Sequence, residues 1–321
     1  MRQTTGETKK INRHAVKAFL EATAGAWALV ALILLFYSMN GAFLNQFNIR
    51  NLFNNMATLL IMCCGATLLR IIGSLDLSMG AVCSVANVIF VSTLASLGAA
   101  SYLVAIGFGM LAGFMLGFLH TKLKIPSFIA SLGFMNIWQS VALLIVKTPF
   151  SIKKAQQVFI EWGKIRFGVI DLPTIFSIVL LGVFALFLTY TVAGRSMDLI
   201  GCNERAARLA GVKTDRYKIL AFTITGVTSA LCGILLAIRL RSCDPAVGLP
   251  YTLLAYAAVF LIGGHGNVLK TLLGVGIVTV IDNGMTIIGV DAFWSRIIFG
   301  SLIIVSMILT MDRGGRKAIV K

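Results

Sequence analysis

Ten apolar runs, separated by short polar segments, constrain the fold of this chain more than any other feature of its sequence. A helix needs about 20 apolar residues to cross the hydrocarbon core of a bilayer. The pattern therefore predicts an all-α polytopic membrane protein with about ten transmembrane helices. One run is short and ends in glycines, which predicts that some spans are discontinuous. The runs lie at about residues 22–38, 52–70, 77–97, 100–119, 126–146, 173–193, 218–238, 252–264, 268–289 and 294–311.

The composition excludes three classes of protein: soluble globular proteins, disordered proteins and secreted proteins stabilised by disulfide bonds. Apolar residues make up 58% of the chain and charged residues only 12%, whereas a soluble domain carries about 25% charged residues. Every polar segment is shorter than the roughly 50 residues that an independent domain needs. We therefore expect residues 1–321 to form one transmembrane domain. The sequence has no GxxxxGK[ST] phosphate-binding loop, so an ATPase that drives transport would be another polypeptide.

The positive charges indicate how the spans are oriented. The formal net charge is +16, and most of the 28 Lys and Arg residues fall in segments that are cytoplasmic if the amino terminus is inside. Cytoplasmic loops of membrane proteins carry such an excess. We expect both termini in the cytoplasm, with residues 1–17 as a tail. The charges cluster between apolar runs, which indicates a bilayer surface and no nucleic acid as partner. The basic segment 147–172 would lie outside, which this rule does not predict.

The sequence predicts no metal site, no cofactor and no catalytic residue. It has six cysteines and three histidines, without a CxxC pair or a Cys/His cluster. Most of the cysteines lie inside apolar runs, where a buried, small apolar thiol is the ordinary interpretation. A membrane enzyme would need clustered His, Asp or Glu residues at one face. We therefore expect no enzymatic activity.

Segment 195–217 is expected to be a cytoplasmic loop that contains a short helix. Asn203 is a good N-cap, Glu204 suits the first turn and Gly211 suits the position just past the helix end. A helix of about two turns is not stable alone, so it needs a partner or a packed base. A solvated loop that contacts lipid headgroups is the alternative. The residues expected to form the contact surface are Gly201, Asn203, Glu204, Arg205, Ala206, Ala207, Arg208 and Gly211.

Polar residues within and between the apolar runs are candidates for lining a transport pathway. Placing a carboxylate at membrane depth costs about 2.5–3.5 kcal/mol of free energy on insertion scales, so we expect Asp76 to have a structural or functional role. It suits either a cap for a helix that begins near Leu77 or a hinge beside the pathway. For the other polar residues, an interhelical hydrogen bond is the alternative. The pathway candidates are Asp76, Ser78, Gly80, Asn87, Asn136, Asp282 and Asn283.

Glycines recur along one apolar run at spacings of two and four. These are Gly107, Gly109, Gly113 and Gly117. A spacing of four places small residues on one helix face, where another helix backbone can approach closely. This pattern predicts tight packing within a bundle.

Four stretches, in the same order, resemble the permease subunits of bacterial ABC importers for sugars, the family of the ribose, xylose and autoinducer-2 permeases. Residues 75–80 (LDLSMG) resemble the family's G-I-D-L-S-x-G signature, and residues 200–212 (IGCNERAARLAGV) resemble its cytoplasmic G-x-N-x-x-A-A-x-x-x-G-I loop. Residues 237–251 resemble the outer loop that follows. Residues 282–290 resemble the N-N-G-x-x-x-x-G-V motif near the last span.

The resemblance implies a set of partners in a bacterial cytoplasmic (inner) membrane. Two permease chains, identical or paralogous, form the pathway. ABC ATPase subunits dock on the cytoplasmic side, and an extracytoplasmic solute-binding protein delivers a sugar or a sugar-like solute. Segment 195–217 would then contact the ATPase. Arg239, Arg241 and Asp244 would contact the binding protein, although snorkelling to headgroups is an equal alternative for the two arginines.

An ion-coupled secondary transporter of a small polar solute is the alternative function. Such a protein needs acidic residues near the membrane midplane. Asp76 and Asp282 are the candidates, but the whole chain has only 12 acidic residues. The energy source of uptake distinguishes the two hypotheses.

Overall fold

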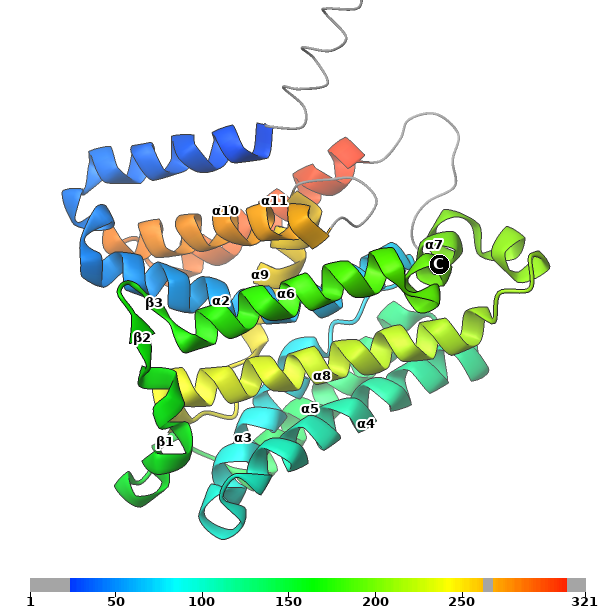
Figure 1. The fold of residues 1–321 in the computed structure, drawn as a ribbon, viewed down its shortest axis with the longest axis horizontal. Coiled ribbons are helices and arrows are strands. Elements are labelled where there is room, and N and C mark those ends of the chain that lie inside the picture. Colours follow the sequence, from blue (N-terminus) through cyan, green and yellow to red (C-terminus); the bar gives the residue numbers. More distant parts are fainter. Residues whose placement is uncertain (1–23, 262–267, 311–321) are drawn as a thin grey trace, which may run out of the picture.

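The computed structural model describes residues 24–261 and 268–310, and most of these residues are helical (Figure 1). The first described helix is Ala24–Met39. A 3-10 turn, η1 (Gly41–Leu44), and ten further α-helices follow it within the described ranges. These helices are α2 (Gln46–Ile71), α3 (Met79–Leu97), α4 (Ala100–Lys122), α5 (Ser127–Ile145), α6 (Leu172–Tyr190), α7 (Val192–Leu209), α8 (Thr214–Leu240), α9 (Leu249–Leu261), α10 (Val268–Ile287) and α11 (Ala292–Thr310).

Each of the ten predicted apolar runs coincides with a described helix, which confirms the all-α polytopic fold. Six helices, namely α2 to α6 and α8, are long and apolar enough to cross a membrane. Three further apolar helices are shorter, at Ala24–Met39, Leu249–Leu261 and Phe293–Val305. The glycines that end the short run at 252–264 lie outside the described residues, as does the tail 1–17.

Helix α8 lies at the centre of the bundle and packs against α2, α3 and α4. Most residues of α2, α3 and α8 are buried, whereas about a third or fewer of the residues of α4, α5 and α6 are buried. Apolar side chains that are exposed on a membrane-spanning helix lose nothing in lipid, because the surrounding acyl chains are equally apolar. The fold thus has a buried central layer and an outer layer that is suited to lipid or to another membrane subunit.

Three of the four recurring glycines form the contact between α4 and α8. Side chains at Gly109, Gly113 or Gly117 would run into the backbone of α8. The reciprocal position is Gly226 on α8, which faces Gly109 and Gly113. Gly107 faces open space. The predicted tight packing is therefore confirmed for the three glycines that are spaced by four.

The two ends of the bundle differ in structure (Figure 1). Helix α7, the end of α4 and the start of α8 gather at one end, which we call the α7 end. At the other end, which we call the strand end, β1 (Phe150–Ser151) pairs antiparallel with β4 (Ser242–Cys243). The strand end also holds the 3-10 helix η2 (Lys154–Lys164) and the hairpin of β2 (Arg166–Phe167) and β3 (Ile170–Asp171). The 27 residues of α8 connect the two ends, a length of about 40 Å at 1.5 Å per residue.

Candidate functional site

Helix α7 consists of two helical segments that meet at Asn203. The backbone of Asn203 is extended, with φ −162° and ψ 102°. Its side-chain Oδ1 accepts hydrogen bonds from the N–H groups of Arg205 and Ala206, both at 3.1 Å. Asn203 is therefore the N-cap of the second segment, as its sequence context predicts. The segment before it, which the sequence analysis did not predict to be helical, begins at Val192 after a cap by the Thr191 hydroxyl.

The second segment ends in the way that its glycine predicts. Gly211 has a φ of +84°, a backbone conformation that costs little only for glycine. The Val212 N–H donates to the Ala207 carbonyl at 3.0 Å, and the Gly211 N–H donates to the Arg208 carbonyl at 3.1 Å. This pair of bonds is a Schellman motif. The short helix thus has a defined start and a defined stop.

We call the two segments of α7, which meet at Asn203, the elbow. Its first segment anchors it to the bundle. Met197 and Ile200 are buried in the apolar core that α2, α6 and α8 share. Gly201 packs so closely on the end of α2 that a side chain there would overlap the Ile71 carbonyl. In the second segment, Ala207 is buried. Core packing supplies the base that the sequence analysis expected a two-turn helix to need.

Two of the predicted contact residues are engaged within the chain. Glu204 pairs with Lys218 at 2.8 Å and with Arg208 at 3.3 Å. Arg208 also reaches Asp215 at 3.3 Å and donates to the Thr214 hydroxyl at 2.9 Å. These pairs link α7 to the start of α8. The two ion pairs of Arg208 are exposed, so each stabilises the protein by at most about 1 kcal/mol.

The face of α7 that points away from the bundle carries different residues. Arg205 and Ala206 are exposed, and Leu209 is 90% exposed, among the highest values for a large apolar side chain. Arg205 and Leu209 lie four residues apart and so share one helix face. The sequence analysis missed Leu209, although its position one turn after Arg205 is a usable signal. We call Arg205, Ala206 and Leu209 the outer face of α7.

Asp76 lies in the break between α2 and α3 and is only 2% exposed. Its Oδ1 accepts from the Ser78 N–H at 2.7 Å and from the Ser78 hydroxyl at 2.5 Å. The helix then begins at Met79, two residues later than expected. Ser78 is the N-cap of α3 and makes no side-chain cap bond, so Asp76 stabilises the turn before α3 and, contrary to the prediction, does not cap the helix itself. Gly80 follows, and its N–H donates to the Thr252 hydroxyl on α9 at 2.9 Å.

Tyr256 on α9 holds the same break from the other side. Its hydroxyl accepts from the Asp76 N–H at 2.7 Å and donates to the Asp76 carbonyl at 3.0 Å. Sequence reasoning missed Tyr256, because nothing in the apolar run of α9 marks it as a partner of residue 76. The break is therefore a braced turn in which both backbone groups of Asp76 are hydrogen-bonded inside the protein, as the bilayer interior requires.

The remaining pathway candidates are dispersed across the bundle. Asn87 bridges α3 to the Gly233 carbonyl at 3.2 Å and to the Asp244 N–H at 3.0 Å. Asn283 on α10 exchanges two hydrogen bonds with Asn48 on α2, at 2.9 and 3.0 Å. Asn136 is exposed on α5 and donates to its own helix at Leu132. The contacts of Asn87 and Asn283 match the interhelical hydrogen-bond alternative, whereas the bond of Asn136 lies within its own helix.

The strand end collects the remaining predicted residues. Arg239 and Arg241 are exposed at the end of α8. The Asp244 carboxylate accepts from the Ala246 N–H at 2.8 Å and so shapes the following turn. The pathway candidate Asp282 lies on α10, where the Thr286 hydroxyl donates to its backbone carbonyl at 2.9 Å. Across residues 24–261 and 268–310, no cluster of His, Cys, Asp or Glu is suited to a metal ion.

Comparison with known proteins identifies relatives of the whole chain. The family model "branched-chain amino acid transport system / permease component" matches residues 48–307. The ribose import permease protein RbsC of Bacillus subtilis is 30% identical over 317 residues, which cover 96% of this chain and 97% of that protein. The autoinducer 2 import system permease protein LsrC of Yersinia pseudotuberculosis is 30% identical over 304 residues, which cover 89% and 84%.

A solved structure has the same fold at low sequence identity. It is described as an inward-facing, metal-chelate-type ABC transporter. The TM-score is 0.54 at 13% identity, and the match covers 89% of this chain and 98% of that one.

Proposed function

The chain belongs to the family of branched-chain amino acid transport system permease components, and from this premise we propose that the outer face of α7 is its docking surface for a separate ATPase. The protein is a multi-pass permease subunit of an ABC importer in the bacterial inner membrane. It belongs to a transport family and not to a family of enzymes. The power for transport therefore comes from a partner polypeptide.

One observation carries the docking proposal. The elbow is packed on the bundle, and it leaves the side chain of Leu209 exposed. Burial of a fully exposed leucine contributes about 1.5–3 kcal/mol, and Leu209 is 90% exposed beside Arg205. The caps at Asn203 and Gly211 fix the second segment of α7, and the core residues of the first segment fix its base. A partner that displaces the outer face would therefore also displace α2, α6 and α8, because α7 contacts these three helices. Coupling between nucleotide-driven motion and the spans requires such a stiff connection.

The other partners follow from the two-ended architecture. We place the α7 end in the cytoplasm, with both termini on the same side, and the strand end outside. The extracytoplasmic solute-binding protein would contact Arg239, Arg241 and Asp244 at the strand end. A second permease chain, identical or paralogous, would cover part of the apolar surface that α4, α5 and α6 expose. The proposed pathway lies between the two chains, on the side of the Asp76 break.

The proposed solute is a sugar or a sugar-like molecule. Relatives with about 30% identity over most of their length are named for ribose and for autoinducer 2. The test reconstitutes the chain with its cognate ATPase and binding protein in proteoliposomes. It offers labelled pentoses and, in parallel, branched-chain amino acids. We expect ATP-dependent uptake of the sugar that the binding protein retains, and amino-acid uptake alone would overturn the sugar assignment.

The substitution Asp76→Asn separates the ABC importer from an ion-coupled transporter. The Oδ1 of an asparagine can accept the same two hydrogen bonds from Ser78, so the structural role of Asp76 predicts uptake within about twofold of the wild type. An ion-coupling acid that loses its charge would stop uptake. Collapse of the proton gradient should leave uptake intact, and ATP depletion should abolish it. The ABC account fails if Asp76→Asn abolishes uptake or if uptake follows the gradient.

A further inference from the structure

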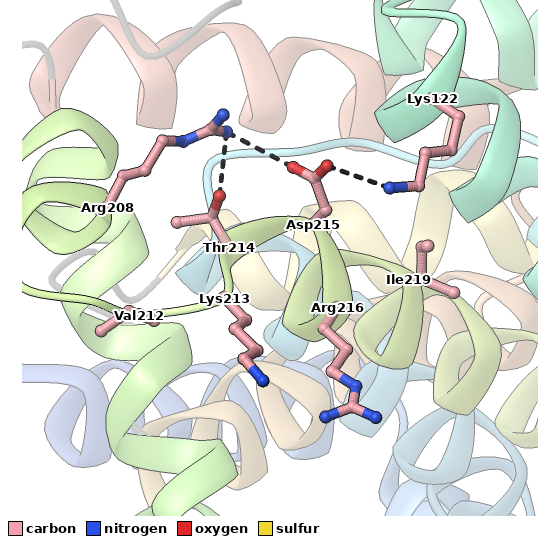
Figure 2. Close-up of a pocket in the computed structure, with 8 residues that line it drawn as sticks. All are labelled: Lys122, Arg208, Val212, Lys213, Thr214, Asp215, Arg216 and Ile219. Carbon is pink, nitrogen blue, oxygen red and sulfur yellow. Dashed lines mark hydrogen bonds and ion pairs between the residues drawn. The ribbon is translucent and has the colours of Figure 1, made fainter.

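A basic pocket lies at the α7 end, outside the proposed docking face. It has a volume of about 450 Å³ and is open to the surroundings. Figure 2 shows the charged side chains that line it: Lys122 from α4, Arg208 from α7, and Lys213, Asp215 and Arg216 at the start of α8. Four cations and one carboxylate give the lining a formal charge of +3. This excess of positive charge attracts anions to the pocket.

The single carboxylate of the pocket is already shared between two cations. Asp215 lies 3.4 Å from Lys122 and 3.3 Å from Arg208. The side chains of Lys213 and Arg216 extend away from this chain of contacts, as Figure 2 shows. Among the ion pairs of residues 24–261 and 268–310, none includes Lys213 or Arg216. Two charges of the pocket therefore have no acidic partner in the described chain.

The pocket lies where two membrane-spanning helices change from apolar to charged surface. On α4, the exposed Phe118 precedes Lys122 by one turn. On α8, the exposed Leu220 follows Arg216 by one turn, and the partly buried Ile219 lines the pocket. An apolar-to-cationic change within one turn on both helices marks the depth of the lipid headgroups, where Lys and Arg side chains reach the interface.

We propose that the basic pocket binds the phosphate of an anionic phospholipid, with Lys213 and Arg216 as its direct ligands. Arg208 and Lys122 form the wall and are held in place by Asp215. Basic pockets between membrane helices typically bind such headgroups. The bound lipid would brace the junction of α4, α7 and α8, next to the elbow. This proposal is independent of the docking face, so its failure would leave the proposed ATPase contact intact.

The test measures lipid binding to the purified chain by native mass spectrometry, with phosphatidylglycerol as the anionic probe and phosphatidylcholine as the neutral one. The double variant Lys213→Gln/Arg216→Gln should weaken phosphatidylglycerol binding about tenfold or more, because each cation near an anionic surface contributes about a fivefold change. Both side chains are exposed, so the fold should persist, and an unchanged melting temperature verifies this. Millimolar inorganic phosphate should not displace the lipid.

A charge-matched control is available at the same end of the bundle. Lys124 and Arg195 are exposed and do not line the pocket, so Lys124→Gln/Arg195→Gln should leave the affinity for phosphatidylglycerol unchanged. Equal losses in both double variants would overturn the proposal in favour of unspecific charge attraction. Displacement by inorganic phosphate would assign the pocket to a free anion. Unchanged lipid binding with loss of ATPase co-purification would assign it to the protein partner.

Discussion

Leucine in place of Gly113 is expected to lower the melting temperature of the purified protein by about 5–10 °C. A Cβ at Gly113 would overlap the Phe222 carbonyl oxygen and lie 3.0 Å from the Thr223 Cα. These are backbone atoms of α8, so no side chain can rotate to make room. Forcing extra atoms into a tight contact costs about 1–3 kcal/mol or more, and each kcal/mol lowers the melting temperature of a large domain by about 2–4 °C.

Gly107→Leu is the matched control on the same helix. Gly107 lies on α4, and nothing is within 4 Å of a Cβ at this position. Leucine also favours the helical backbone over glycine by nearly 1 kcal/mol. The control should therefore melt at the wild-type temperature or slightly above it. A similar loss of stability in both variants would show that the α4–α8 contact is not the cause.

The substitution Leu209→Arg is expected to weaken the association with the cognate ATPase at least tenfold and to reduce ATP-driven uptake in proportion. The change removes an exposed apolar contact and adds a cation beside Arg205 and Arg208. Loss of about 1.4 kcal/mol of binding free energy is tenfold in affinity, and an interface anchor contributes about 2 kcal/mol or more. Arginine suits the last turn of a helix, so the elbow should stay folded. The affinity is measured with both partners in nanodiscs.

Val158→Arg is the matched control for the docking prediction. Val158 is an exposed apolar residue on η2, with 70% exposure, at the strand end of the bundle. The variant introduces the same charge, far from the outer face of α7. ATPase affinity should be unchanged in this variant. Wild-type ATPase affinity in Leu209→Arg, with the protein still folded, would contradict the proposed docking face.

Features that depend on neighbouring residues in the chain could be predicted from the sequence. Asn203 caps a helix through its own side chain, and Gly211 ends it through its own backbone conformation. The apolar runs likewise coincide with the helices, because hydrocarbon thickness sets their length. Asp76 also bonds a residue close to it in sequence, Ser78, but this bond lies in the turn before α3 and is not the predicted cap.

Features that depend on distant segments could not be predicted. Glu204 and Arg208 were predicted as contact residues, and the sequence of the short helix did not show that they also pair with Lys218 and Asp215 of α8. The brace on the Asp76 backbone comes from Tyr256, 180 residues away. The glycines of α4 show the same limit: the spacing predicted a packing face, but only the partner helix decides which glycines lie in it.

The cysteines of the chain provide a direct probe of its orientation. Cys202 lies on α7 and is exposed, whereas the other five cysteines are buried. Burial, with a smaller contribution from Asp244, also raises the pKa of the Cys243 thiol to about 12. That thiol therefore stays protonated and unreactive, because the thiolate is the reactive form. Of the six thiols, only Cys202 should react quickly with a reagent that cannot cross the membrane.

Labelling of Cys202 with a membrane-impermeant maleimide tests the central claim that α7 is a cytoplasmic docking element. The wild-type chain should be labelled in inside-out vesicles and not in right-side-out vesicles. Added ATPase should protect it, and Cys202→Ser should abolish the signal. Labelling from the outside, or equal labelling with and without a bound ATPase, would contradict the account.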